Sequence, residues 1–430
     1  MYYKNAFPII KPFLFYGRFI NRTLTRKTYT QRDNARWIKN EIVKMGPAYI
    51  KMGQLVASRS DIFDEPYIEE LQDLHNNVDP IEFDVLKSLL VDYYDTPEDI
   101  FSLIDETPVA SASVGQVHKG KLRYNNSEVA IKFRKPNVVE EFTNDFKVMI
   151  DIMKVIKNCN PRSRKVQDLY EMIKTCSLNI LKELDFNNEC HNMKLMTETF
   201  ANEPSIYIPK VYTSLTNDSI LVTEFIQCST IHSLNNINIS NQLMRLMIIN
   251  GINKGYIHGD LHRGNIGLKL NEFGEHEFIL FDFGLILEID KKKINQLLYA
   301  LSFNDVDVFI DILLKENVII VQDNDFDSIS QIRSIALYVK DYLQHLDIMK
   351  LVNDIQMDTT IDLQHTNFRL NEKYYLISRT LTLLEGTCKG LSDDFSYVRT
   401  MMQGLLDIDI NFDMLIGKIQ FDINHLTKKI

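Results

Sequence analysis

The pattern of hydrophobic and polar positions predicts helices for the part of the chain that follows a short N-terminal arm. From Asp33 to about Asp105, apolar residues recur at the spacing of one helix face. Gly46-Pro47 is expected to end one helix and start the next, and Asp64 is expected to cap a further helix. The sequence therefore predicts a helical extension over residues 33–105.

Strand signals appear after this extension. Between Val109 and Arg134, two short runs rich in β-branched residues flank Asn125-Asn126-Ser127, a sequence typical of a hairpin turn. The later elements are long helical stretches with short strand-like runs between them. We expect helices over 137–158 and 163–199, strands over 207–212, 220–225, 266–270 and 278–281, and mainly helix elsewhere beyond about residue 241.

The composition is that of an ordinary folded chain. Hydrophobic residues make up 45% and charged residues 25% of the 430 residues, a length that allows two or three domains or one bilobal enzyme. The net charge of −10 argues against nucleic acid as a partner. Five dispersed cysteines without a Cys-x-x-Cys pair favour an intracellular, reducing compartment. No apolar run reaches the roughly 18 residues of a membrane-spanning helix.

Positive charge is concentrated in the first 40 residues. They contain nine Lys and Arg residues against one acid, Asp33, so they carry +8 while the other 390 residues carry −18. Residues 7–20 interleave aromatic and aliphatic side chains with basic ones, as segments at an anionic membrane surface do. Three interpretations stay open: an arm packed on the main body, a peripheral membrane contact and an organelle-import presequence.

Two motifs in the second half predict phosphoryl-transfer chemistry. They are His258-Gly-Asp260-Leu-His-Arg-Gly-Asn265 and, about 20 residues later, Phe281-Asp282-Phe283-Gly284. Transfer of a γ-phosphate needs an acid that orients the attacking oxygen and oxygen ligands for Mg²⁺. Asp260 is the predicted catalytic acid, and Asn265 and Asp282 are the predicted Mg²⁺ ligands. We expect His258 and His262 to hold the loop.

A cation for the α- and β-phosphates of ATP or ADP is expected on an earlier strand. Val129-Ala-Ile-Lys132 has the pattern of that strand, so Lys132 is the predicted phosphate ligand. Its partner would be a carboxylate of the following helices. Glu183, Asp185 and Glu189 all lie there within two turns, and the spacing alone leaves open which of them it is.

The expected phosphate loop departs from the glycine-rich pattern of protein kinases. Alanine and serine alternate over the first four positions of the segment from Ala110 to His118, and Gly115 is its single glycine. Nucleotide contacts are predicted along this loop and at two strand positions outside it. These residues are Ala110, Ser111, Ala112, Ser113, Val114, Gly115, Gln116, Lys132 and Glu224.

The order of these elements and motifs predicts an α+β fold of the bilobal protein-kinase-like type, preceded by a helical extension. Strands with inserted helices come first and a larger helical part follows, which is the order of the two kinase lobes. The predicted divisions are a basic arm, a helical extension, an N-lobe and a C-lobe. They cover residues 1–32, 33–105, 106–226 and 227–430.

Over residues 33 to 320 the chain resembles the UbiB family of atypical protein-kinase-like proteins, also called AarF-domain kinases. The resemblance rests on Lys51-Met-Gly53-Gln54, which matches the Lys-x-Gly-Gln motif of the family, with Arg59-Ser-Asp61 and Asp79-Pro80 downstream. It rests also on the alanine-rich loop at 110–118 and on Glu183-x-Asp185. Arg263 stands where relatives usually have proline, from which we expect altered loop rigidity.

The resemblance implies specific pairings and a function. It implies that Lys132 pairs with Glu189, and that Lys51 and Gln54 reach the carboxylates of Glu183 and Asp185. Lys51, Gly53, Gln54, Glu183 and Asp185 would then hold the helical extension over the pocket where a peptide substrate would lie. The implied activity is Mg²⁺-dependent binding and hydrolysis of ATP, linked to coenzyme Q, other isoprenoid-quinone lipids or a membrane surface. A homodimer or a lipid-biosynthesis complex is the assembly compatible with it.

Two other functions remain open at this point. The motif around Asp260 is also similar to that of aminoglycoside and choline phosphotransferases, which favours a small-molecule or protein kinase. A non-catalytic pseudokinase scaffold is the other alternative, although Asp260, Asn265 and Asp282 are all present.

Overall fold

The computed structural model of the 430-residue chain forms two compact units. The first unit is Met1–Leu195 with Pro209–Gln227, and the second is Met196–Ile208 with Cys228–Ile430. The predicted segments Arg59–Asp61 and Asp79, and nearly all of the basic arm, lie outside the described residues. The structure describes residues 18, 29–57, 63–72, 74, 80–231, 236–271, 274–302, 306–321, 326–345, 368–397 and 400.

The helical extension of the first unit begins with two helices that meet at Gly46. They are α2 (Gln31–Met45), which Thr30 caps, and α3 (Pro47–Val56). Gly46 has a φ of 115°, a left-handed value that favours glycine, and Pro47 occupies the first position of α3. The predicted helix break at Gly46-Pro47 is therefore confirmed.

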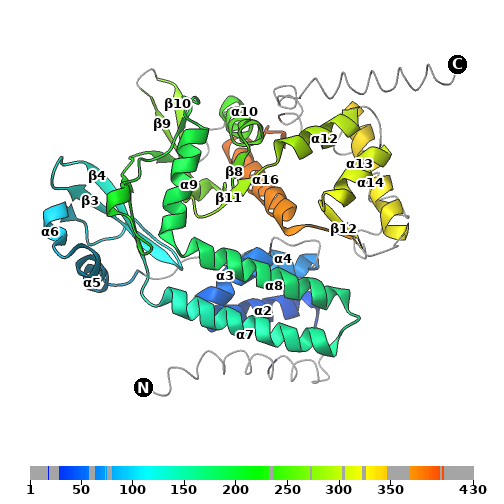
Figure 1. The fold of residues 1–430 in the computed structure, drawn as a ribbon, viewed down its shortest axis with the longest axis horizontal. Coiled ribbons are helices and arrows are strands. Elements are labelled where there is room, and N and C mark those ends of the chain that lie inside the picture. The colour runs from blue at the N-terminus through cyan, green and yellow to red at the C-terminus, as the bar shows by residue number, and fades with distance from the viewer. Residues whose placement is uncertain are drawn as a thin grey trace. The chain divides into compact units, whose positions relative to one another are not determined.

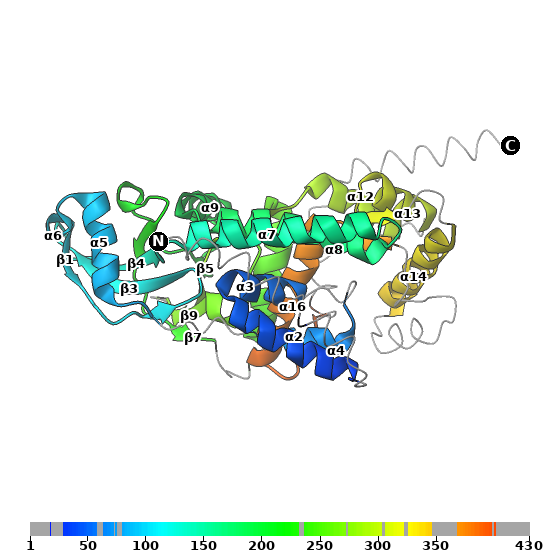
Figure 2. The same cartoon turned by 90° about the horizontal axis from the view of Figure 1, so that it is seen from below.

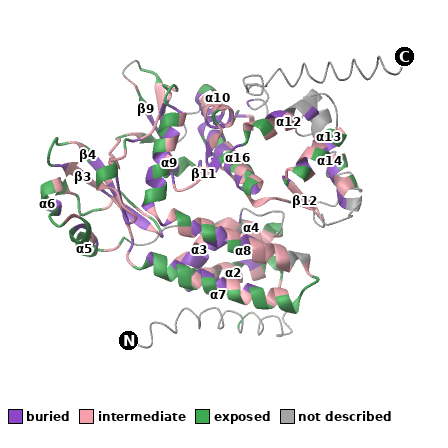
Figure 3. Ribbon diagram, viewed as in Figure 1, coloured by how far each residue is buried: buried purple, intermediate pink, exposed green. Residues whose placement is uncertain are grey.

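Figure 1 labels the other helices that lie or begin in this unit. They are α4 (Glu65–Gln72), α5 (Phe83–Tyr94), α6 (Pro97–Ile100), α7 (Val138–Cys159), α8 (Arg164–Glu183) and α9 (Phe186–Thr199). Helices α7 and α8 lie side by side, and α3 packs against both (Figure 2). Their facing sides share one apolar core, which includes Met52, Phe142 and Ile180. Buried positions of this core appear on those faces in Figure 3.

A five-stranded antiparallel sheet completes the first unit. Its strands are β1 (Phe101–Ile104), β2 (Ala110–Ser111), β3 (Gly115–Leu122), β4 (Glu128–Arg134) and β6 (Ile220–Glu224), in the order β1-β3-β4-β6 with β2 on β3. The predicted hairpin at residues 125–127 joins β3 to β4 and is confirmed.

Two predicted elements of this unit are wrong in part. The helical extension does not reach Asp105, because residues 101–104 form β1; Phe101 and Ile104 lie three apart and so also match a helical spacing. The helix predicted over 163–199 is two helices. It breaks after Glu183 because the Oδ1 atom of Asp185 accepts a hydrogen bond from the N–H of Asn187 and starts α9 anew.

The second unit contains short strands among helices. Its four-stranded sheet has the order β5 (Ile206–Tyr207), β10 (His276–Leu280), β9 (Ile266–Leu270) and β7 (Ser229–Thr230). Two further sheets have two strands each: β8 (Tyr256–His258) pairs with β11 (Ile286–Glu288), and β12 (Ile319–Val321) pairs with β13 (Phe368–Leu370). The predicted strands near 266–270 and 278–281 are confirmed. The predicted run 207–212 is a strand only at its start, and strands of three residues such as β8 and β11 are too short for periodicity to reveal.

Helices make up the rest of the second unit. They are α10 (Ile237–Met244), the π-helix η2 (Arg245–Asn250), α11 (Gly251–Lys254), α12 (Lys291–Ser302), α13 (Val306–Lys315), α14 (Phe326–His345) and α16 (Glu372–Leu391), with short 3-10 turns η1 (Thr213–Leu215, in the first unit) and η3 (Arg263–Asn265). Among the described residues, no helix combines the length and the apolarity that a membrane crossing requires. None of the five cysteines forms a disulfide.

Candidate active site

Lys132 and Glu189 form an ion pair in the first unit. The Lys132 Nζ atom lies 3.0 and 2.8 Å from the two carboxylate oxygens of Glu189. The side chain of Glu189 is only 4% exposed and that of Lys132 is 25% exposed, so water screens this pair little. Nζ also lies 5.2 Å from the ring centre of Phe186. Of the three carboxylates that the sequence left open, Glu189 is the partner.

The alternation of β4 explains why Lys132 is available for this contact. Val129, Ile131 and Phe133 are fully buried on one face of the strand, which places Lys132 and Arg134 on the other. Arg134 donates hydrogen bonds to the carbonyls of Leu184 and Asp218, at 2.8 and 2.6 Å. It thereby fixes the junction from which α9 starts and brings Glu189 to Lys132.

Sequence analysis missed Arg134, although its position two residues after Lys132 on the same face was a signal. Its guanidinium also pairs with the carboxylate of Asp218 at 2.9 Å. Partial burial raises the pKa of Asp218, but hydrogen bonds from Arg134, Tyr93 and Ser219 outweigh burial and lower it. Asp218 is therefore a stable anion that holds Arg134 in place.

The alanine-rich loop forms a tight turn between β2 and β3. The N–H of Ala112 donates to the carbonyl of Gly115 at 2.8 Å, and the carbonyl of Val114 accepts from the N–H of Lys135 at 2.9 Å. A Cβ atom at Gly115 would lie 2.5 Å from the carbonyl oxygen of Phe133. Glycine is thus required here by the close approach of β4, whatever else the loop binds. Contacts of residues 110–115 with nucleotide remain a prediction.

Gln116 has a structural role that the sequence did not suggest. Its side chain is 1% exposed; its Oε1 accepts from the N–H of Ile81 at 3.0 Å, and its Nε2 donates to the carbonyl of Ile81 at 3.1 Å. The same Nε2 donates to Nε2 of His118 at 2.8 Å. The buried side chain of Gln116 therefore ties the segment before α5 to β3, and a nucleotide contact of this residue stays a prediction.

His118 completes this buried network. Since its Nε2 accepts from Gln116, its Nδ1 carries the hydrogen and donates to the carbonyl of Asp105 at 2.7 Å. The imidazole also packs between the rings of Phe83 and Phe133. Burial lowers the pKa of His118 more than the contact with Asp105 raises it. The histidine is a neutral structural residue of the first unit.

The Lys51–Gln54 segment of α3 contacts two different parts of the first unit. Lys51 Nζ lies 3.0 Å from the Glu183 carboxylate at the end of α8, as the family resemblance implied. The Nε2 atom of Gln54 donates to the carbonyl of Leu74 at 2.7 Å, and the expected contact of Gln54 with the carboxylates of Glu183 and Asp185 stays a prediction. A Cβ atom at Gly53 would lie 2.6 Å from Leu74 Cδ1. The segment therefore joins the residue that follows α4 to the helix that precedes Glu189.

The carboxylates of Asp185 and Glu224 both accept hydrogen bonds from backbone N–H groups. Asp185 caps α9, as described above, and the Glu224 carboxylate accepts from the N–H of Lys210 at 3.3 Å. The predicted contact of Asp185 with the lysine segment and that of Glu224 with nucleotide are left as predictions.

The predicted catalytic loop, which is the His258–Asn265 motif of the second unit, is organised around His258. This histidine is 1% exposed. Its Nδ1 accepts from the N–H of Asp260 at 3.1 Å, so its Nε2 carries the hydrogen and donates to the carbonyl of Phe281 at 3.0 Å. Burial lowers the pKa of His258, although the carboxylates of Asp260 and Asp282 act in the opposite direction. The histidine thus links the two motifs through their backbones, and the expected structural role is confirmed.

The predicted Mg²⁺ ligands belong to the same bonded arrangement. Asn265 Nδ2 donates to the carbonyl of Asp260 at 3.0 Å, so the Oδ1 atom, the one that Mg²⁺ would bind, lies on the other side of the amide. Asp282 has a φ of 57°, a left-handed value that non-glycine residues rarely adopt. Backbone strain of this kind is concentrated at functional sites. An amide oxygen and a carboxylate, with phosphate oxygens, are a donor set that fits Mg²⁺.

Among the described residues, no group of three or more His, Cys, Asp and Glu side chains could hold a metal. A Mg²⁺ ion that is shared with nucleotide phosphates does not need such a group, because it takes only one or two protein carboxylates.

Arg379 is a residue of the site that the sequence analysis did not find. It lies on α16, and its Nη2 atom is 3.2 Å from Oδ1 of Asp260. His262, by contrast, behaves as expected, since its Nδ1 accepts from the N–H of Gly264 at 3.0 Å. No motif marks Arg379, and only the packing of α16 on the loop brings it to Asp260.

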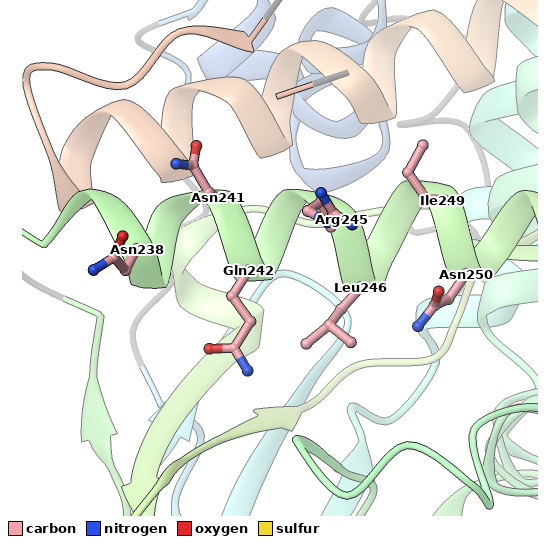
Figure 4. Close-up of a pocket in the computed structure, with 7 residues that line it drawn as sticks. All are labelled: Asn238, Asn241, Gln242, Arg245, Leu246, Ile249 and Asn250. Carbon is pink, nitrogen blue, oxygen red and sulfur yellow. The ribbon is translucent and has the colours of Figure 1, made fainter. Parts of the chain in front are cut away.

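A separate hollow of about 370 Å³ lies along α10 and η2. Figure 4 shows its lining: Asn241 points toward α16, while Gln242 and Leu246 lie on the opposite side of the helix. Asn241 accepts a hydrogen bond from Thr400, and Gln242 donates one to Ser205. The lining contains no carboxylate and none of the predicted nucleotide or Mg²⁺ ligands, so this hollow is not part of the phosphoryl-transfer site.

Three curated proteins are similar to this chain over at least 66% of its length. The probable protein kinase UbiB of Vibrio cholerae is 27% identical over 309 residues, with 66% of this chain and 56% of that protein covered. The Arabidopsis thaliana protein named ACTIVITY OF BC1 COMPLEX KINASE 7, chloroplastic, is 25% identical over 394 residues, with 88% and 55% covered. An uncharacterized Synechocystis protein is 25% identical over 390 residues, with 88% and 65% covered.

This chain thus spans between 55 and 65% of the length of these three relatives. Among solved structures, that of Rv3197 from Mycobacterium tuberculosis in complex with erythromycin matches with a TM-score of 0.54 at 21% identity, over 78% of this chain and 86% of that one. This likeness concerns the fold alone and agrees with a kinase-like domain of mixed α and β content. The model of the ABC1 atypical kinase-like domain matches residues 73–308, more than half of the chain, and the chain therefore belongs to the ABC1 family.

Proposed function

We propose that this protein is a Mg²⁺-dependent ATPase with a two-lobed, kinase-like arrangement. The observation that carries the proposal is the ion pair between Lys132 and Glu189, at 2.8 and 3.0 Å. In protein kinases, a lysine of an early strand paired with a glutamate of a following helix must be in place for phosphoryl transfer. A chain without this activity has little reason to keep a nearly buried glutamate opposite a strand lysine, because burying such a charge is costly.

The chain's own residues take distinct roles in this proposal. Lys132, held by Glu189, binds the α- and β-phosphates, and the turn at Ala112–Gly115 lies against the nucleotide. Asn265, through Oδ1, and Asp282, through its carboxylate, hold Mg²⁺. When bound, the ion neutralises charge that develops on the phosphates. Asp260 orients the attacking oxygen, and His258 fixes the backbones of the loop and of Phe281.

We further propose that the α3 segment, the Lys-x-Gly-Gln motif of the resemblance, limits access of peptide substrates. The contact that supports this is the ion pair of Lys51 with Glu183, three positions before the first residue of α9. It ties the helical extension to the same stretch of chain that presents Glu189. The expected consequence is hydrolysis of ATP with little transfer to protein hydroxyls.

The cellular role that we propose is in isoprenoid-quinone or other membrane-lipid metabolism, at the surface of a membrane. The support is the family resemblance and the net charge of +8 over the first 40 residues, which favours an anionic surface. Because the Arabidopsis relative is named as chloroplastic, we include import into an organelle in this proposal.

The test is ATP hydrolysis by the purified full chain in Mg²⁺, with and without anionic liposomes, and with a generic protein substrate present. Wild type is compared with Asp282→Asn and Lys51→Ala. We expect hydrolysis by wild type that liposomes increase, a loss of at least about 100-fold in Asp282→Asn, and phosphorylation of the protein only with Lys51→Ala.

Other outcomes would favour the alternatives. Nucleotide binding without hydrolysis would support a pseudokinase scaffold. Ready transfer to the protein substrate by wild type, or to a small hydroxylated molecule, would support a phosphotransferase and would contradict the proposed role of Lys51.

A further inference from the structure

Helix α16 contacts the catalytic loop of the second unit at successive residues. The hydroxyl of Thr380 lies 2.9 Å from the carbonyl oxygen of Gly259, and that of Thr387 lies 3.2 Å from the carbonyl oxygen of Leu261. Thr380 and Thr387 are seven apart, which is two helical turns, and both are buried. One face of α16 therefore follows the backbone on both sides of Asp260.

The C-terminal end of α16 meets the loop as well. A Cβ atom at Gly390 would lie 3.3 Å from Nη2 of Arg263, so the missing side chain leaves room for this guanidinium. A cation is favoured there by the carbonyls at the end of a helix. Arg263 stands where relatives usually have proline. Its packing on α16 gives a structural reason for an arginine at this position.

Arg379 lies on the same helix and contacts the side chain that performs the proposed chemistry. Its Nη2 atom is 3.2 Å from Oδ1 of Asp260, while Oδ2 of Asp260 lies 3.7 Å from Nε2 of His262. Arg379 is 19% exposed and Asp260 is 26% exposed. A guanidinium on one oxygen restricts rotation of the carboxylate about χ2, and it leaves the second oxygen for another contact.

α16 also lies outside the region that carries the recognised motifs. The family model matches residues 73–308, and α16 begins at Glu372. The contact is therefore supplied to the catalytic loop by a part of the chain that no motif marks.

We propose that Arg379 is a positioning residue: it orients the Asp260 carboxylate so that Oδ2 faces the attacking oxygen, and α16 is the element that holds both. The inference rests on the proposed ATPase function and adds to it a residue that acts through Asp260. A misplaced orienting group lowers the rate of the chemical step more than the binding of nucleotide, because ATP does not depend on Asp260 for its affinity.

The experiment uses the full chain and measures kcat and KM for ATP in Arg379→Gln and Arg379→Lys. We expect kcat to fall between about 10- and 100-fold in Arg379→Gln with KM changed less than about threefold, and Arg379→Lys to recover part of kcat. Lys389→Gln is the matched control, since Lys389 is a cation of the same helix that pairs with Glu385 on the surface. It should leave both constants unchanged.

A double-mutant comparison separates positioning of Asp260 from a general effect on the loop. If Arg379 acts through Asp260, Arg379→Gln changes the residual rate of Asp260→Asn by less than about twofold. Thr380→Val removes a loop contact without touching the carboxylate. The proposal is overturned if Thr380→Val lowers kcat as much as Arg379→Gln does. It is also overturned if the fold-losses in kcat of Arg379→Gln and Asp260→Asn multiply in the double variant.

Circular dichroism and the thermal midpoint of each variant show that it is folded. If Arg379→Gln does not fold, Arg379→Lys tests the positioning role, because it keeps a cation at the position but lacks the guanidinium. In that case, kcat and KM equal to those of wild type would overturn the need for a guanidinium. Failure of this inference is distinct from failure of the proposed function. Wild-type hydrolysis that is lost in Asp282→Asn but unaffected in Arg379→Gln overturns the positioning role alone, whereas a wild type without hydrolysis overturns the function.

Discussion

The two units fix their charged site residues in different ways. In the first unit, Glu189 is almost completely buried and both of its oxygens lie within 3.0 Å of Lys132. In the second, Asp260 is partly exposed and lies on a loop that His258 and α16 hold through its backbone. Its carboxylate oxygens lie 3.2 Å from Arg379 and 3.7 Å from His262. We therefore expect the charge pair to matter for the stability of the first arrangement and for the orientation of Asp260 in the second.

The largest expected effect is the loss of Glu189. In Glu189→Leu, Lys132 loses its charge partner, and we expect the free energy of unfolding to fall by about 3 kcal/mol. Trp37, the only tryptophan of the chain, lies in α2 of the first unit, so urea unfolding followed by its fluorescence measures this unit.

The double variant Lys132→Met with Glu189→Leu is the control for this prediction. It should recover most of the stability, because two apolar side chains leave no unpaired charge, while activity stays lost. Asp311→Asn, which breaks an exposed pair with Lys315 in the second unit, should change stability by at most about 0.5 kcal/mol, measured by circular dichroism in urea because Trp37 lies in the first unit. Equal effects of Glu189→Leu and Asp311→Asn would contradict the contrast between buried and exposed pairs.

A second effect distinguishes two glycines of the first unit. Gly115→Ala places a Cβ atom against the carbonyl of Phe133 in a neighbouring strand, so we expect a loss of about 2 kcal/mol. Gly53→Ala meets only the tip of the Leu74 side chain, which can move, and should cost less. The same fluorescence measurement ranks the two. A larger loss for Gly53→Ala would mean that α3 tolerates less adjustment than the sheet does.

A smaller effect is expected for the backbone contacts of the second unit. The hydroxyl oxygen of Thr380 lies 2.9 Å from the carbonyl oxygens of both Gly259 and Leu376. Its single hydrogen can be donated to one or the other of these two acceptors. Thr380→Val should therefore lower the free energy of unfolding by about 1 kcal/mol, measured by circular dichroism in urea. If the loss matched that of Glu189→Leu, the second unit would depend on single contacts as much as the first.

The smallest effect concerns pH, and it is shared by the two units. Burial lowers the pKa of both His118 and His258 below 6.5, so the unfolded chain binds protons at a pH where the folded chain does not. Stability is then complete above pH 6.5 and falls as the pH drops below that value. Each histidine contributes a loss of at most about 0.8 kcal/mol at pH 6. Fluorescence-detected unfolding of His118→Gln between pH 7.5 and pH 5.5 should show a weaker pH dependence than wild type.

Much of the candidate site could be predicted because each residue lies in a motif whose chemistry restricts it. Lys132 is the last residue of the Val-Ala-Ile-Lys motif in β4, and Asp260, Asn265 and Asp282 follow a fixed order. The choice of Glu189 over Glu183 came from the family resemblance and not from spacing, and the structure agrees with it. The strands near 266–270 and 278–281 were found from local pattern as well, since short runs rich in Ile, Leu and Phe give a strand signal.

The elements that the sequence did not predict are short or depend on distant contacts. Strand β1 exists because it pairs with β3, and its Phe101 and Ile104 fit a helical spacing equally well. Gln116 looked like part of a phosphate loop, yet its side chain lies inside the unit against Ile81, 35 residues away. Local pattern alone does not show on which side of a strand a polar residue finds its partners.

The sequence by itself determined the candidate site residues of this protein, because these depend on residue type and short spacing: a strand lysine, the aspartate of the His258–Asn265 motif and two candidate Mg²⁺ ligands, together with most of a helical extension. Tertiary structure decided which partners those residues meet. Arg379 is 119 positions from Asp260 and Glu189 is 57 from Lys132, and no local propensity acts over such separations. Packing of buried faces, which the hydrophobic effect drives, selects those contacts, so the arginine of α16 became visible only in the folded chain.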